Sequence, residues 1–297
     1  MNYPTIKQLR YFIALEEHGH FARAAESCFV SQSAFSVAIR ELESVLNIQL
    51  ADRDNKNVTI TPVGKEIAVH ARLVLRDLEG LMDIAVSCQP PLTGKLKIGV
   101  IPTIAPFLIP RILPGLKKSF PRLDLFLYED ITQRVYQQLM DGDLDLIIIA
   151  LPYELKKVEY MRLFRDKFYF ASKRNSRLLK GKSFSIEQLP GESVLLMEDG
   201  HCLRDHALSA CKIRNLDKVS QMTASSLLTL IQMVDADLGV TFLPEMVCNS
   251  AMIKSFRLDI KPMSAGSYRD IGLVWRKGSA RKREFNLLGE YICEQLK

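Results

Sequence analysis

Residues 21–64 read "FARAAESCFVSQSAFSVAIRELESVLNIQLADRDNKNVTITPVG", and their pattern indicates how the N-terminal part of the chain folds. Its start predicts a short helix that breaks at Phe29 and Val30. Ser31 follows, and its hydroxyl can cap a second helix by accepting a backbone N–H. In that helix apolar side chains recur every three or four residues, at Phe35, Ile39, Leu42 and Leu46. The stretch therefore predicts helix, tight turn and helix, with one face of the second helix packed in a core.

The other face of the second helix is small and polar, as a surface that enters the major groove of DNA should be. The candidates for contact with bases and phosphates are Ser31, Gln32, Ser33, Ser36 and Arg40. The following "DRDNKNVTITP" alternates like a strand and predicts a β-wing whose Arg53 and Lys56 reach the DNA backbone. A helical hairpin that never meets DNA would show the same pattern. Charge does not decide between them, because residues 1–62 hold six Lys and Arg against seven Asp and Glu, in a chain of net charge +6.

The same residues resemble the winged helix-turn-helix of LysR-type transcriptional regulators, and this resemblance favours DNA binding. The matching positions are Phe21, Ala24, Ala25, Ser31, Gln32, Ser36, Ile39, Leu42, Glu43, Leu50, Arg53, Thr61 and Gly64. Two positions depart from the family pattern, since Ser33 replaces a frequent proline and Ala51 a frequent phenylalanine. The resemblance implies a transcriptional regulator that binds double-stranded promoter DNA, and not an enzyme.

After the wing, apolar residues in "GKEIAVHARLVLRDLEGLMDIAVS" follow alternating steps of four and three. This spacing predicts a long helix that pairs with its twin in a dimer, although a helix facing its own core remains an alternative. "SCQPPLTG" then marks a linker. The strand-like runs beyond it predict an α/β part with a parallel sheet and two subdomains. Those runs are "LKIGVI", "LDLFLYE", "LDLIIIAL", "KFYFAS", "SVLLM", "GVTFLP" and "RDIGLVWR".

The predicted fold class is α/β, with an N-terminal winged helix-turn-helix, a long dimerisation helix and a two-subdomain regulatory domain of the periplasmic-binding-protein type. We place the DNA-binding domain at residues 1–62 and the dimerisation helix with its hinge at 63–92. Regulatory subdomain I takes 93–165 and 268–297, and subdomain II takes 166–267 and carries Cys202 and Cys211. Open α/β sheets bind ligands at the carboxyl ends of their strands, so a cleft between the subdomains is the expected ligand site.

The composition and the N-terminus predict a cytoplasmic protein with no membrane partner. "MNYPTIKQLRYF" lacks the features of a signal peptide, and no apolar run reaches the roughly 18 residues that a membrane span requires. Six cysteines should then be thiols by default. Their spacing indicates no zinc site, and we expect no metal and no cofactor. Each lone cysteine has a plain interpretation as a small buried apolar residue.

The stretch "HCLRDHALSAC", residues 201–211, raises a problem of distance. In a helix Cys202 and Cys211 would lie roughly 13 Å apart, whereas a disulfide needs Cα atoms within roughly 7 Å. In projection Leu203, Ala207 and Cys211 share an apolar face, and Cys202 points away from it. We therefore expect a buried Cys211, and a Cys202 that faces the cleft in the first helical turn, where free N–H groups favour a thiolate.

Over its whole length the chain also resembles the hydrogen-peroxide sensors of the LysR family, through "EDGHCLRD" with the later cysteine and through "RDIGLVWRKGS". The resemblance implies that Cys202 reacts with peroxide and that Cys211 resolves the product as a Cys202–Cys211 disulfide, which unwinds the segment between them. By the same resemblance the peroxide pocket should contain Thr103, Thr132, His201, Asp205 and Arg269. Plainer roles stay open, namely a helix cap for Thr103 and an ordinary salt bridge for Arg269.

The implied partners are RNA polymerase, a thiol reductant such as glutaredoxin or thioredoxin, and further copies of the chain in a dimer of dimers. The implied targets are promoters of oxidative-stress genes. Two other functions remain as alternatives at this point. One is a regulator of the same family that binds a small organic effector in the cleft, with incidental cysteines. The other is a thiol peroxidase, for which a helix-turn-helix has no evident use.

Overall fold

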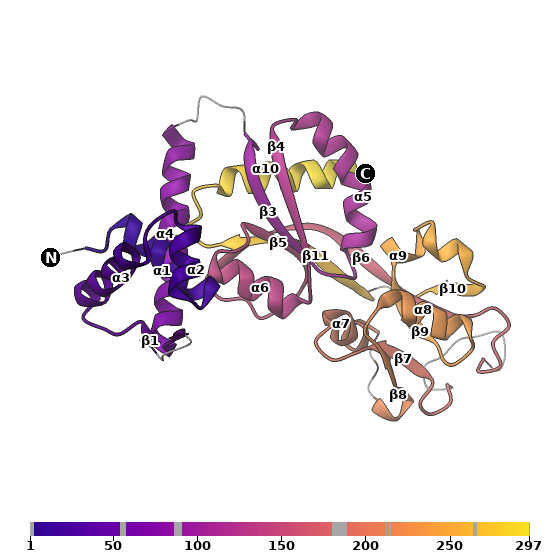
Figure 1. The fold of residues 1–297 in the computed structure, drawn as a ribbon. Helices are drawn as coiled ribbons and strands as arrows, with labels where there is room; N and C mark the ends of the chain where they lie inside the picture. The colour runs from indigo at the N-terminus through magenta and orange to yellow at the C-terminus, as the bar shows by residue number, and fades with distance from the viewer. Residues whose placement is uncertain are drawn as a thin grey trace. The chain divides into compact units, whose positions relative to one another are not determined.

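The structure is a computed structural model that describes residues 3–53, 58–85, 91–179, 189–211, 213, 215–263 and 266–296. The chain divides into two compact units (Figure 1). One unit contains Met1–Pro90 with Met140–Asp143, and the other contains Pro91–Leu139 with Leu144–Lys297. None of the helices in the described ranges is both long and apolar enough to cross a membrane.

The first unit is a winged helix-turn-helix followed by a long helix. Its elements are α1 (Ile6–His18), α2 (Phe21–Ser27), α3 (Gln32–Leu46), β1 (Ala51–Arg53), β2 (Val58–Ile60) and α4 (Pro62–Ala85). As predicted, Ser31 caps α3, because its hydroxyl accepts the backbone N–H of Ala34 at 3.3 Å. Phe35, Ile39 and Leu42 are fully buried, and the ring of Tyr11 on α1 stacks on Phe35 at 5.0 Å.

The turn from the wing into α4 explains two residues of the family pattern. The hydroxyl of Thr61 donates to the backbone oxygen of Gln49 at 3.0 Å and accepts the N–H of Gly64 at 3.0 Å. A Cβ on Gly64 would lie 2.2 Å from the backbone oxygen of Leu50, so only glycine fits there. The two strands of the wing pair antiparallel, with Asp52 opposite Thr59.

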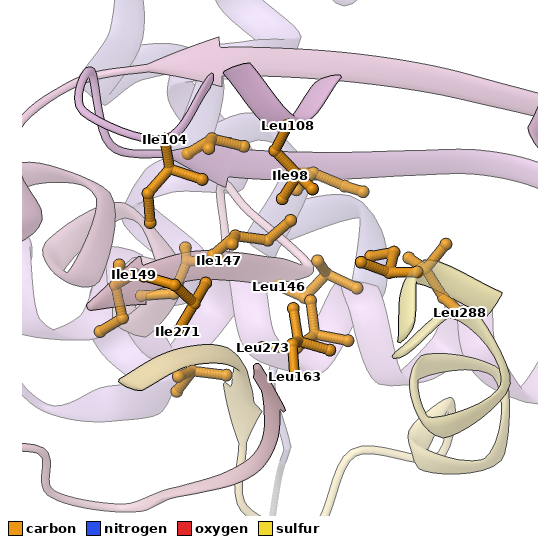
Figure 2. Packing of buried hydrophobic residues seen from close by; sticks show 14 of the residues in the cluster. Ile98, Ile104, Leu108, Leu146, Ile147, Ile149, Leu163, Ile271, Leu273 and Leu288 are labelled. Carbon is orange, nitrogen blue, oxygen red and sulfur yellow. The ribbon is translucent and has the colours of Figure 1, made fainter. Parts of the chain in front are cut away.

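The second unit begins with the predicted parallel sheet. β3 (Gly94–Val100) pairs in parallel with β4 (Leu123–Glu129) and with β5 (Leu146–Leu151), and the chain returns late as β11 (Tyr268–Arg276), antiparallel to β5. The helices of this part are α5 (Ala105–Ser119), α6 (Thr132–Asp141) and α10 (Lys282–Gln295). Figure 2 shows Leu146, Ile147 and Ile149 of β5 between isoleucines and leucines of the neighbouring elements. We call this apolar cluster the first core.

The rest of the unit has a second core of its own. β6 (Val158–Lys173) pairs along its first part with β11 and along its second part with β10 and β9, so one strand runs through both halves of the sheet. The other elements are β7 (Val194–Met197), α7 (Cys202–Ala210), a 3₁₀ helix (Leu216–Lys218), β8 (Val219–Ala224), α8 (Leu227–Asp235), β9 (Thr241–Pro244), α9 (Glu245–Cys248), a 3₁₀ helix (Met252–Ser255) and β10 (Leu258–Pro262). The second core gathers apolar residues of β6, β7, α7, α8 and β9.

Candidate peroxide and redox site

A buried arginine stands at the centre of the site. Arg269, on β11, is 1% exposed. Its guanidinium donates from Nη1 to the hydroxyl of Thr103 at 2.9 Å, from Nη2 to the backbone oxygen of Thr103 at 3.0 Å, and from Nε to Asp166 at 3.0 Å. Nη2 also reaches the thioether of Met246 at 3.8 Å. Among the described residues, these contacts leave one hydrogen on Nη1 without a partner.

Asp166 holds this cation in place. The carboxylate lies on β6, forms an ion pair with Arg269 at 2.9 Å, and accepts the backbone N–H of Met246 at 3.1 Å. Burial raises the pKa of Asp166, while the charge of Arg269 and the two hydrogen bonds oppose that rise. A buried pair of this kind fixes geometry because breaking it would leave one charge uncompensated. The predicted salt bridge of Arg269 therefore exists, and it accounts for only some of the contacts of the guanidinium.

Thr103 does not act as a helix cap. It follows β3, and the cap position of α5 is Ile104, where no side chain makes a capping hydrogen bond. Because its hydroxyl oxygen accepts from Arg269, its O–H remains a donor toward any oxygen nearby. Thr132 lies after β4, at the start of α6, and its hydroxyl oxygen is buried with no hydrogen-bond partner in the described part of the chain. The carboxyl ends of parallel strands thus bring two buried hydroxyls to one place.

The thiol of Cys202 joins this group. Burial raises the pKa of Cys202, and Arg269, the hydroxyl of Thr132 and the backbone at Ala150 act in the opposite direction. The three favourable influences are the ones that would stabilise a thiolate or an anion formed beside it. The site therefore combines a sulfur atom, a fixed cation and a buried hydroxyl in a nearly dry environment.

The expectation for Cys202 needs correction, whereas the one for Cys211 is confirmed. We expected Cys202 to face a cleft as an exposed thiolate, but it is only 8% exposed and its pKa is raised. The reason is that Cys202 packs in the first core beside Ala150 of β5, and desolvation outweighs the opposing effects of Arg269, the hydroxyl of Thr132 and the backbone at Ala150. Cys211 is 5% exposed, as expected, and burial raises its pKa to about 12.

The two faces of α7 belong to different cores, which agrees with the helical projection. Cys202 packs in the first core, whereas Leu203, Ala207 and Cys211 pack in the second. In the structure both cysteines are free thiols, at opposite ends of a helix of nine residues. A disulfide between them therefore requires at least one of these packed faces to come loose.

The remaining predicted pocket residues lie at the edge of the group. His201 is the cap residue of α7 but makes no side-chain capping bond, and Asp205 is exposed. The negative charge of Asp205 acts on Cys202 by raising its pKa. Arg204 turns to Asp199, with an ion pair of 2.9 Å. The structure thus gathers Thr103, Thr132 and Arg269 around Cys202, and gives no hydrogen bond from the side chains of His201 or Asp205 in its described part.

Two residues near Cys202 were missed by the sequence analysis. His206 bonds through Nε2 to the backbone oxygen of Pro152 at 3.0 Å. Tyr153, the next residue, lies beside Cys202, and burial followed by the charge of Cys202 raises the pKa of its phenol. The spacing of four between Cys202 and His206 places both on one face of a helix, and this signal was available in the sequence.

The candidate DNA-binding residues gather at the start of α3. Ser31, Gln32, Ser33 and Arg40 are exposed and Ser36 is partly buried. Ser33 shares a hydrogen bond of 3.1 Å with Ser31, and Arg40 bonds the backbone oxygen of Ser36 at 3.4 Å. Of the two wing residues, Arg53 ends β1 and Lys56 lies outside the described residues.

Comparison with known proteins identifies the class. Residues 6–65 match "Bacterial regulatory helix-turn-helix protein, lysR family", and residues 89–297 match "LysR substrate binding domain". The chain belongs to the LysR family of transcriptional regulators and is not an enzyme of the peroxidase kind.

Several relatives are similar over nearly the whole chain. The "HTH-type transcriptional regulator EstR" of Acinetobacter baylyi is 36% identical over 286 residues, covering 96% of this chain and 95% of the relative. The "Hydrogen peroxide-inducible genes activator" of Haemophilus influenzae is 37% identical over 294 residues, covering 99% and 97%. A solved full-length OxyR variant from Pseudomonas aeruginosa aligns with a TM-score of 0.81 at 33% identity, over 98% of this chain and 95% of that one. The Haemophilus influenzae and Pseudomonas aeruginosa matches confirm the resemblance to the peroxide-sensing members of the family.

Proposed function

We propose that this protein is a transcriptional regulator that senses hydrogen peroxide through Cys202 and stores the signal as a reversible Cys202–Cys211 disulfide. The observation that carries the proposal is the group formed by Cys202, Arg269 and the buried hydroxyl of Thr132, which lies beside the thiol. An organic effector would not need a sulfur atom at this place. A second thiol on the opposite face of the same short helix gives the oxidised sulfur a partner.

The chemistry proceeds in two balanced steps. Cys202 loses its proton, and the thiolate attacks one oxygen of peroxide, the O–O bond breaks, and hydroxide leaves and takes up a proton to become water. The remaining sulfenic acid is then attacked by the sulfur of Cys211, which forms the disulfide and releases a second water. Arg269 and the O–H groups of Thr103 and Thr132 orient peroxide and stabilise the charge on the departing oxygen.

The second step demands a change of shape. Across α7 the cysteines lie about 13 Å apart, so the helix must unwind and Leu203, Ala207 or Cys211 must leave the second core. The remodelled surface then changes how copies of the chain pack, and thereby how the helix-turn-helix units sit on DNA. In this proposal, oxidation of Cys202 and Cys211 changes the contacts that the helix-turn-helix makes with the promoter.

The other parts of the chain serve DNA binding, dimerisation and sensing in this proposal. Residues 1–62 bind promoter DNA through Ser31, Gln32, Ser33, Ser36, Arg40, Arg53 and Lys56. Residues 63–92 pair two copies of the chain. The regulatory domain that follows senses hydrogen peroxide. Residues 93–165 with 268–297 form subdomain I, and residues 166–267 form subdomain II. The protein works in the cytoplasm as a dimer of dimers, recruits RNA polymerase to oxidative-stress promoters, and is reset by glutaredoxin or thioredoxin.

A peroxide titration of the full chain tests the proposal. The wild type, Cys202→Ser and Cys211→Ser are treated with peroxide below one equivalent, and free thiols and DNA footprints are read together. We expect the wild type to lose two thiols for each peroxide consumed and to shift its footprint. Cys202→Ser should do neither, and Cys211→Ser should stop at the sulfenic acid. A wild type without the 202–211 linkage and with an unchanged footprint would refute the proposal. Effector-dependent thermal shifts that persist in Cys202→Ser would then favour an organic effector.

A further inference from the structure

His206 joins the two halves of the second unit at one point. It lies on α7, in the middle of the segment between the two cysteines, and its Nε2 is 3.0 Å from the backbone oxygen of Pro152. Pro152 immediately follows β5, which is packed in the first core, whereas the opposite face of α7 is packed in the second core. This hydrogen bond spans 54 positions of sequence and crosses between the cores.

The protonation pattern of His206 follows from its partners. A backbone oxygen can only accept, so Nε2 carries a hydrogen, and in the neutral imidazole Nδ1 is then the bare nitrogen. Nδ1 is buried and has no hydrogen-bond partner in the described part of the chain. Burial and the nearby Arg269 of β11 lower the pKa of His206, against the opposing effects of Pro152 and of Asp205 on its own helix. The imidazole is therefore a neutral donor near pH 7.

His206 bonds to the same segment, residues 150–153, that packs on Cys202. Ala150 and Tyr153 lie beside the Cys202 thiol, on either side of Pro152. At its far end the same connection is tied down by Tyr136, whose hydroxyl bonds both the backbone N–H and the backbone oxygen of Lys156 at 3.0 Å. One face of α7 is thus fixed to residues 150–153 by Cys202 and, one turn later, by His206.

We propose that His206 is a positioning residue that latches α7 onto the connection between β5 and β6 in the reduced protein, and that this latch limits how readily Cys211 leaves its core. Its role in sensing rests on the proposed function, because the latch must open before Cys211 can reach the oxidised Cys202. The latch itself is a property of the reduced protein and can be measured without peroxide.

The first test measures the opening of α7 directly. In the full chain with Cys202→Ser, the buried Cys211 is labelled with iodoacetamide and its modification is followed by peptide-resolved mass spectrometry. We expect His206→Leu, which fills the space without donating, and His206→Ala to speed labelling about five-fold, the effect of losing one ordinary hydrogen bond. His206→Gln should stay near the starting rate, because its amide can donate to the same oxygen. Ser209→Ala, at an exposed position of α7, is the matched control.

The outcomes separate the latch from the proposed function. Wild-type labelling rates in both His206→Leu and His206→Ala, or a His206→Gln protein that labels as fast as His206→Leu, would overturn the latch. If His206→Ala does not fold, the comparison of His206→Leu with His206→Gln decides alone. In a second measurement, with both cysteines present, His206→Leu should shift the glutathione-buffered equilibrium about five-fold toward the disulfide. A wild type that forms no disulfide would refute the proposed function and leave the labelling result standing.

Discussion

Leu203→Ala tests whether α7 leaves its core when the disulfide forms. Leu203 is 2% exposed and packs in the second core, one residue after Cys202. Truncation of a buried leucine to alanine costs about 3 kcal/mol, within the usual range for well-packed cores. If the oxidised protein has already withdrawn this side chain from the core, the whole cost falls on the reduced form.

That imbalance is measurable as a reduction potential. Destabilising the reduced form makes reduction of the disulfide less favourable, so the potential becomes more negative. For a two-electron couple about 30 mV corresponds to 1.4 kcal/mol, and 3 kcal/mol gives a shift of about 65 mV. The assay equilibrates the protein in glutathione buffers, quenches with acid and counts the 202–211 linkage by mass spectrometry.

Leu243→Ala supplies the control. Leu243 is fully buried in the same core but lies on β9, outside the segment that unwinds. Its truncation should lower the melting temperature of both redox forms and leave the potential unchanged. A Leu203→Ala protein that melts earlier, as the control does, yet keeps the wild-type potential would show that Leu203 stays packed in the disulfide form.

Three further predictions concern other parts of the chain. Gly64→Ala should lower the melting temperature of the winged-helix unit and weaken its DNA footprint, because the added methyl would lie 2.2 Å from a backbone oxygen; an unchanged footprint would speak against this. Arg269→Met should lower the free energy of unfolding in urea by about 3–5 kcal/mol, because it leaves the buried carboxylate of Asp166 without a counter-charge. The double variant with Asp166→Leu should recover part of that free energy. Burial raises the pKa of Cys211 and of Cys248 to about 12, so the stability that these neutral thiols contribute is present below their unfolded pKa of about 8.5 and is lost as pH rises toward 12. The protein with both changed to alanine should show a flatter fall in unfolding free energy between about pH 9 and about pH 11, and an equally steep fall would contradict the assignment.

The periodic parts of the fold were predictable from the sequence. The spacing of Phe35, Ile39 and Leu42 predicted the buried face of α3. The runs of apolar residues predicted β3 and β5, whose inner residues are buried, and also β4, which is apolar although most of its side chains are exposed. Two strands were not predicted. β8, with the sequence VSQMTA, is half exposed and mixes polar with apolar residues without a run of either, and β10 is an edge strand that ends in Pro262, so neither carries a clear apolar signal.

The site was predictable only in part, and the reason is geometric. Helical periodicity shows which side of α7 a residue occupies, and it separated Cys202 from Cys211 correctly. It does not show what lies across from that side. The end of β5 covers Cys202, so the expected exposed thiol is a buried one, and Pro152 meets His206 there. Such contacts between distant segments depend on how the two cores pack, which no local pattern records.

β6 has a consequence for the way a signal travels. Its sixteen residues are paired along their length, first with β11 and then with β10 and β9. A hinge motion of the two halves would therefore have to twist β6 together with its paired neighbours. An unpaired linker between the halves would offer no such resistance. We therefore expect the sheet to stay rigid while the short helix α7 unfolds and refolds. The rate of the response is then set by the unfolding of α7.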